Sequence, residues 1–197
     1  MPTYIAMLRG INIGPSKRVE MFRLKKMFEN LGFKNVRTYI QSGNVVFQGR
    51  GTAAGLAAKI EKGMMKAFGF SALIMMRTQD EMDRAIANNP FVQPCQKNPA
   101  YVHVCFLSQA PAAEAVKRLH ALGTKREQVK YAGNEVYVYH VDGLGKARVL
   151  NHTVLERVLA VKVTMRNWNT SSRLQEMAAE KRASQRTPRT TKEEKIR

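Results

Sequence analysis

The chain contains two similar segments, each of which places a glycine-asparagine turn before a strand-like run. Residues 41–47 read QSGNVVF and residues 131–137 read YAGNEVY. Each segment follows an expected strand and helix, and each precedes another helix and strand. A Gly-Asn pair flanked by β-branched and aromatic residues is typical of a β-hairpin. The sequence therefore predicts two copies of one α+β unit.

The first half of the chain alternates strand-like and helix-like patterns. Strands are expected at residues 3–8, 36–40, 45–47 and 72–76, and helices at 21–31 and 52–68. Thr78 opens a further short helix, with Glu81 three residues later completing a capping box. The order β-α-β-β-α-β with a trailing helix is that of a ferredoxin-like, or split βαβ, unit.

The second half repeats this order. Strands are expected at residues 101–107, 128–131, 136–139 and 161–165, and helices after Pro111, over the apolar residues 149–159, and at about 167–180. We expect a first subdomain at 1–92, a linker at 93–100 and a second subdomain at 101–180. Residues 181–197 are rich in Lys, Arg, Thr and Glu and are expected to form a disordered basic tail.

The chain is strongly basic, with a net charge of +18 and an isoelectric point near 10.3. Residues 181–197 contribute only +5 of this charge, so the folded part is basic as well. Such a protein is attracted to polyanions. The leading hypothesis is a non-enzymatic binder of nucleic acid or other polyanions, supported by the charge, two open sheets and the basic tail. Tyr137 and Tyr139 alternate suitably for RNA stacking, but the aromatic-rich signature of RNA-binding strands is not recognisable. Cross-strand packing explains these tyrosines equally well, and a solvated basic surface without a specific partner is the other interpretation of the charge.

Several other classes of protein are not indicated by the residues. Two cysteines and four scattered histidines lack metal-ligand spacing, so neither a metal nor a cofactor is expected. No nucleophile, base and orienting group can be assembled, which leaves enzymatic activity open without a candidate mechanism. The sequence has no signal-peptide pattern and no apolar run long enough for a membrane span. A soluble, cytoplasmic protein without a membrane partner is expected.

A small-ligand site is the alternative function, and we place it where the first strand ends beside the start of the third. Glycine turns there permit backbone N–H groups to face an anion, while arginine and lysine add charge. The candidate ligand residues are Arg9, Gly10, Asn12, Lys17, Gln41, Ser42, Asn44, Arg166 and Asn169. The ligand would be a phosphate or a nucleotide. The competing interpretation is that the glycines serve turns and the asparagines hydrogen-bond nearby backbone.

Two further interpretations remain open. The stretch Gly143-Leu144-Gly145-Lys146 resembles a phosphate loop, but it fails the Walker A pattern and a tight turn is favoured. The two subdomains could also form a purely structural or protein-interaction module, which would expose an apolar patch.

Four segments together resemble one family: LRGINIG at 8–14, RTYIQSGNVVF at 37–47, NPF at 89–91 and RNWNT at 166–170. Over about residues 3–178 the chain is similar to DUF1697, a family of mostly bacterial proteins of unknown function. The resemblance implies an α+β fold of two interlocked ferredoxin-like (βαββαβ) subdomains with trailing helices, and no established activity. Family members usually carry a Ser-Lys pair where this chain has Gly145-Lys146-Ala147-Arg148, so the basic character is kept without the hydroxyl.

Overall fold

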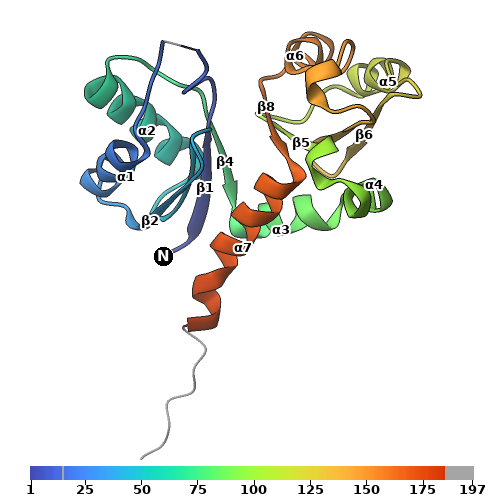
Figure 1. Cartoon of the computed structure of the whole chain (residues 1–197). Coiled ribbons are helices and arrows are strands. Elements are labelled where there is room, and N and C mark those ends of the chain that lie inside the picture. Colours follow the sequence, from blue (N-terminus) through green and yellow to red (C-terminus); the bar gives the residue numbers. More distant parts are fainter. Residues whose placement is uncertain (15, 185–197) are drawn as a thin grey trace, which may run out of the picture.

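The computed structural model describes residues 1–14 and 16–184 and contains two four-stranded antiparallel sheets (Figure 1). The first unit comprises β1 (Thr3–Leu8), α1 (Met21–Asn30), β2 (Lys34–Tyr39), β3 (Asn44–Gln48), α2 (Ala53–Phe68) and β4 (Ile74–Thr78). Its strand order β2-β3-β1-β4 is that of a ferredoxin-like unit. Helices α3 (Gln79–Ala87) and α4 (Val92–Lys97) and the 3₁₀ turn η1 (Pro99–Tyr101) lead into the second unit.

The second unit has the same topology. It comprises β5 (Val102–Leu107), α5 (Ala113–Ala121), β6 (Glu127–Ala132), β7 (Glu135–His140), the 3₁₀ turn η2 (Leu144–Lys146), α6 (His152–Leu159), β8 (Val163–Asn167) and α7 (Trp168–Ser184). The strand order is β6-β7-β5-β8, again with antiparallel neighbours. The predicted α+β fold of two ferredoxin-like subdomains is confirmed.

Local sequence signals set several helix ends. The Thr52 side chain accepts a hydrogen bond from the Gly55 amide at the start of α2, and Gly69 ends this helix in the left-handed region at φ 76°. The predicted capping box at the start of α3 is present, with Thr78 and Glu81 bonding each other's backbone N–H groups.

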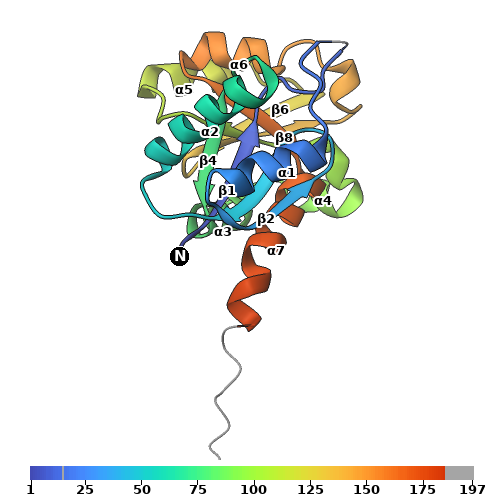
Figure 2. The ribbon, with the colours of Figure 1, turned by 90° about the vertical axis from the view of Figure 1, so that its left-hand side faces the viewer.

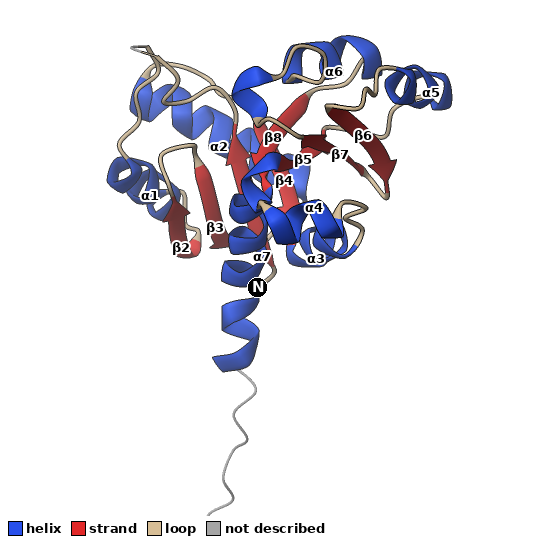
Figure 3. Ribbon diagram, turned by 45° about the vertical axis from the view of Figure 1, so that its right-hand side comes forward, coloured by secondary structure: helices blue, strands red, loops and turns tan. Residues whose placement is uncertain are grey.

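Each sheet is covered on its outer face by its own pair of helices (Figures 2 and 3). In the first unit, Leu24 and Phe28 of α1 and Ile60 of α2 pack against Ala6 and Phe47 of the sheet. In the second unit, α5 and α6 pack in the same way over β5 and β7. The apolar residues that recur at helical spacing on these four helices therefore pack against the apolar residues at alternate positions of the strands beneath them.

The inner faces of the two sheets share one apolar cluster. Ile5 and Val46 from the first sheet belong to the same cluster as Val104 and Phe106 from the second. Helix α7 supplies Leu174 to this cluster and contacts strands of both sheets, running between them in Figure 1. The two units are thus joined by a common core and not by a surface contact alone.

The expectation of open sheet faces is wrong. Tyr137 is fully buried and its hydroxyl donates to the carbonyl of Ala85 at 2.6 Å. Tyr139 packs against Phe91, with ring centroids 6.0 Å apart. These tyrosines face the shared core because burying them removes a large aromatic surface from water. No sheet face with exposed aromatics is available to stack on RNA bases in the described part of the chain.

The expected linker at 93–100 contains regular structure, namely most of α4 and the turn η1. Its prolines fit because Pro99 opens η1 and needs no N–H donor there. Of the expected tail, residues 181–184 belong to α7, and residues 185–197 lie outside the described residues. Over the described ranges, no helix has the length and apolar character required to cross a membrane.

Helix α6 begins later than the apolar pattern predicts. Val149 and Leu150 precede it, and Asn151 caps its first turn by accepting from the Val154 amide at 3.1 Å. The amides of Arg148, Val149 and Leu150 instead donate to the carboxylate of Glu127 at distances of 2.7–3.2 Å, from 21 to 23 residues away. A buried carboxylate therefore holds this segment out of the helix.

The pKa of Glu127 is lowered from its ordinary value of 4.5. Burial acts to raise it, and the amides of Leu150, Arg148 and Val149 outweigh burial by stabilising the ionised form. A carboxyl with a depressed pKa stabilises the fold above about pH 4.5, and this contribution is lost as pH falls through the folded-state pKa.

Replacing Glu127 by glutamine is expected to lower the free energy of unfolding by about 1–3 kcal/mol at neutral pH. Urea titrations of both proteins measure this difference, which should shrink as pH falls below about 4.5 and through the folded-state pKa of Glu127. The control is Glu61→Gln on α2, expected to change stability by less than about 0.5 kcal/mol. An undiminished difference at low pH would contradict the role of the ionised carboxylate.

Candidate functional site

The end of β1 meets the start of β3, as the sequence predicts. Met7 lies opposite Asn44 in the sheet register, and the Leu8 amide donates to the Gly43 carbonyl at 2.8 Å. Gly43 has a φ of 76°, and a Cβ at this position would lie 2.6 Å from Cδ1 of Ile11. Glycine is therefore required here both for backbone conformation and for the close approach of the neighbouring loop.

Arg166 at the end of β8 reaches into this junction from the second unit. Its five N–H groups are all used, and they donate to Oδ1 of Asn44 (2.7 Å), the carbonyls of Leu8 (3.1 Å), Ser42 (3.0 Å) and Met165 (3.0 Å), and the hydroxyl of Thr164 (3.2 Å). Desolvation lowers the pKa of Arg166 to about 10, so it stays charged at neutral pH. Because a guanidinium has five donors, none is left for a ligand.

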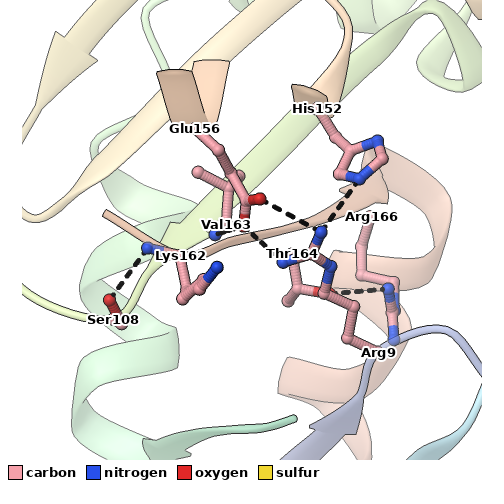
Figure 4. Close-up of polar contacts among 8 residues, drawn as sticks. All are labelled: Arg9, Ser108, His152, Glu156, Lys162, Val163, Thr164 and Arg166. Atoms are coloured by element: carbon pink, nitrogen blue, oxygen red, sulfur yellow. Dashed lines mark hydrogen bonds and ion pairs between the residues drawn. The ribbon is translucent and has the colours of Figure 1, made fainter. Parts of the chain in front are cut away.

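Arg9 points across to α6 of the second unit (Figure 4). It forms a two-pronged ion pair with Glu156, and its Nη2 lies 3.0 Å from Nε2 of His152. Glu156 also accepts from the Val163 amide at 2.8 Å. Burial acts to raise the pKa of Glu156, and the Val163 amide with the charge and hydrogen bonds of Arg9 lower it overall. The geometry is that of a bridge between the two units.

Asn12 closes the loop that follows β1. Its side-chain amide donates to the carbonyls of Val19 (2.9 Å) and Gln41 (2.8 Å), and its Oδ1 accepts from the Val19 amide at 2.7 Å. Asn44 donates to the Ser42 hydroxyl at 2.9 Å. Both asparagines thus satisfy neighbouring groups of the protein, which is the structural interpretation given above for these residues.

The other candidate residues contribute no side-chain hydrogen bond to this junction in the described part of the chain. The backbone carbonyl of Lys17 accepts from the Asn12 amide at 3.0 Å. Lys17 stands over the ring of Phe70 at 5.9 Å, and Gly10 adopts a left-handed turn at φ 73°. Asn169 lines a separate cavity of about 460 Å³ beside Trp168 and Cys95, on the side of α3 and α4. The structure therefore brings Arg9, Asn12, Gln41, Ser42, Asn44 and Arg166 together at the junction but not Asn169.

This junction fastens the two units to each other. The partners of Arg9 in α6 and those of Arg166 in the first unit lie more than 120 residues away in sequence. Glu156 gave no local signal that would have identified it. Within the ranges 1–14 and 16–184, no group of three or more His, Cys, Asp or Glu side chains is placed to hold a metal ion. The small-ligand site at this edge stays a prediction.

A second feature is a basic surface over the helices of the first unit, which we call the basic helical layer. It consists of nine exposed cations on or beside α1 and α2: Lys17, Arg18, Arg23, Lys25, Lys26, Lys34, Lys59, Lys62 and Lys66. Within residues 17–34 and 59–66 only three acids, all glutamates, accompany them. Helices α1 and α2 themselves carry six Lys/Arg and two Glu, whereas α5 and α6 together carry three Lys/Arg and two Glu.

The cations of the basic helical layer are largely free of counter-charges. Among the described residues, Lys25 is the only one of the nine in an ion pair, with Glu29 at 3.7 Å. A groove of about 410 Å³ runs between α1 and α2 and is bordered by Arg23, Lys26 and Lys66. Beside it Phe22 is 68% exposed, with the Lys26 ammonium 5.4 Å from its ring centroid. Helices α1 and α2, which carry most of this layer, face the viewer in Figure 2.

The chain is similar in fold to a solved structure, the conserved bacterial protein SP0830 from Streptococcus pneumoniae, with a TM-score of 0.71 and 20% sequence identity. The match covers 90% of this chain and 98% of that one. No curated protein sequence matches the chain. Residues 1–137 match the family described as protein of unknown function DUF1697. The chain accordingly belongs to the DUF1697 family.

Proposed function

We propose that this protein is a non-enzymatic binder of nucleic acid and that the basic helical layer is its contact surface. The observation that carries the proposal is the set of nine exposed cations with one ion pair among them in the described residues. Unpaired Lys and Arg side chains on one face release counterions when they neutralise phosphates, and this release drives association.

The groove gives this surface a shape suited to a nucleic-acid strand. Arg23, Lys26 and Lys66 border it, so phosphates that follow the groove meet a cation from each helix. The exposed ring of Phe22 offers a base a stacking surface. Because both sheets are covered, base readout on a sheet is not part of the proposal. Binding is expected to be salt-sensitive and to depend little on base sequence.

The junction around Arg9 and Arg166 supports the alternative, a small phosphate or nucleotide ligand, less well. The donors of Arg166 are occupied by the protein, and Arg9 is paired with Glu156. A ligand there would have to displace internal hydrogen bonds of buried groups, whereas phosphates at the basic helical layer meet exposed cations with one ion pair among them in the described residues.

The experiment is fluorescence anisotropy with a labelled single-stranded oligonucleotide and three versions of the full chain. The combined change Arg23→Gln, Lys26→Gln and Lys66→Gln is expected to weaken binding by about 10–100-fold near ~0.1 M salt, because about three phosphate contacts are lost.

The matched control removes the same charge from exposed positions of the second unit, by Arg118→Gln, Lys125→Gln and Lys130→Gln. It should weaken binding by less than about threefold, since it changes only the long-range field. Equal weakening by both variants would mean that net charge and not this surface governs association, and the proposal would then be rejected.

A further inference from the structure

The second unit contains its own basic cavity, remote in sequence from the basic helical layer. It has a volume of about 700 Å³ and is lined by the start of β6, the end of β7 and the loop that carries η2. Its cations are Arg126, Lys146 and Arg148, and its acids are Glu127 and Asp142. A volume of this size suits a small molecule and exceeds the space that a lone inorganic anion fills.

Both acids of the cavity are already engaged by the protein. Asp142 pairs with Arg126 at 2.6 Å. Glu127 is 8% exposed and accepts from the backbone amides that follow Ala147. By contrast, Lys146 and Arg148 are exposed and have no ion pair within the described part of the chain. The cavity lining therefore has one more cation than acid, and Lys146 and Arg148 are available to contact a ligand.

The loop that carries these cations is fastened at both ends. Glu127 holds its later part through the three amides, and Gly143 bends its start at φ 82° against the ring of Tyr101. A Cβ on Gly143 would lie 3.2 Å from Cε1 of Tyr101, so the loop packs closely there. Because the backbone of this loop is already fixed, less conformational entropy is lost when its side chains bind a ligand.

The Gly143-Leu144-Gly145-Lys146 turn does not cradle an anion with its backbone as a P-loop does. The amides of Lys146 and Ala147 donate within the turn, to the carbonyls of Gly143 (3.2 Å) and Leu144 (3.0 Å). The side chains, and not these two amides, are left to hold an anion. A guanidinium and an ammonium two residues apart provide a fork and a point charge, the two forms that bind phosphoryl oxygens.

We infer that this cavity binds a small phosphorylated molecule, with Lys146 and Arg148 on the phosphoryl oxygens. Arg126 lies at the same cavity and can turn from Asp142 to the phosphate as a third cation. The lining is made of charged side chains, His140, two glycines and one alanine, with no large apolar side chain, so the rest of the ligand is polar. The site is separate from the proposed nucleic-acid surface on α1 and α2.

The test is isothermal titration calorimetry of the full chain with inorganic pyrophosphate as the probe. The double variant Lys146→Ala with Arg148→Ala is expected to weaken binding at least about tenfold, since two charge-assisted contacts are removed. The matched control, Lys130→Ala with Arg118→Ala, removes one lysine and one arginine from exposed positions outside the cavity and should change binding less than about twofold.

Equal weakening by the two variants would overturn the inference. So would the absence of any binding heat from the unmodified chain up to about 10 mM pyrophosphate, since a Kd of about 10 mM corresponds to less than about 3 kcal/mol of binding free energy. An NMR titration supplies a second readout, in which the amides of Gly143 and Gly145 should shift on addition of pyrophosphate.

Two further arms separate this inference from the nucleic-acid proposal. Loss of pyrophosphate binding in the double variant with unchanged oligonucleotide binding supports a separate small-molecule site. Parallel loss of both ligands would place the cavity on the nucleic-acid surface and overturn the small-molecule assignment. The triple variant Arg23→Gln, Lys26→Gln and Lys66→Gln is expected to bind pyrophosphate as the unmodified chain does.

Discussion

Replacing Glu135 by alanine is expected to lower the free energy of unfolding by about 3–5 kcal/mol, because it leaves the charge of Arg77 buried without its partner. Arg77 is 9% exposed and Glu135 is 3% exposed, and Nε of Arg77 donates to Oε1 of Glu135 at 3.0 Å. The other nitrogens of Arg77 donate to the carbonyls of Met76 (2.8 Å) and Leu107 (2.9 Å). The pair joins β4 of the first unit to β7 of the second, so its loss should loosen the shared core.

Urea unfolding of the two proteins measures this loss. The control is Glu114→Ala, which breaks the exposed Glu114–Lys117 pair and should change stability by less than about 0.5 kcal/mol. A second variant, Glu135→Leu with Arg77→Met, removes both charges and should recover much of the stability. If Glu135→Ala were as mild as the control, the buried pair would not hold the units together.

Replacing Arg166 by methionine is expected to cost about 2–4 kcal/mol, since the change leaves several polar groups of the junction without their donor. Arg166 connects β8 to the start of β3 and the end of β1 through Asn44, Ser42 and Leu8. Methionine has a similar length and is apolar, so the loss reports mainly the hydrogen bonds. Thermal unfolding followed by circular dichroism gives the change.

Lysine at position 166 keeps the charge but offers one ammonium in place of a planar fork, and it should recover only part of the loss. The control is Arg173→Met on the exposed surface of α7, where the ion pairs with Glu176 and Glu180 are solvated and contribute little to stability. Full recovery by lysine would show that charge alone matters at the junction.

The elements of the fold were largely predictable because their signals are local. The period-2 and helical patterns, the cap at Thr52 and the capping box at Thr78 each involve residues within a few positions of one another. The start of α6 was missed for the opposite reason. Val149 and Leu150 fit the helical pattern, and the group that holds them out of the helix, Glu127, lies more than 20 residues earlier.

The candidate site was predictable only in part. Antiparallel pairing of β1 with β3 follows from the topology, and it correctly placed Asn12 beside Gln41. The ion-pair partner of Arg9 could not be predicted in this way. Glu156 comes from the other unit, 147 residues away, and its position depends on how the two units pack. The role of a charged side chain such as Arg9 depends on its partners in the folded chain, and composition and spacing do not specify those partners.

The basic helical layer combines both kinds of information. The excess of lysine and arginine over glutamate near α1 and α2 can be counted in the sequence. The groove bordered by Arg23 and Lys66 exists only because α1 and α2 lie side by side on one sheet. Because both sheet faces are covered, the proposed nucleic-acid contact lies on these helices and not on the strands.

The most direct test of the nucleic-acid proposal is the salt dependence of oligonucleotide binding by the full chain and by a chain ending at Ser184. Residues 185–197 carry five Lys/Arg and two Glu, and the shorter chain keeps the whole basic helical layer. If that layer is the contact surface, the shorter chain binds a single strand with a slope of log K against log salt of about −2 or steeper, since each phosphate contact contributes about −0.7. A slope near zero, or loss of binding when residues 185–197 are removed, would contradict the proposal.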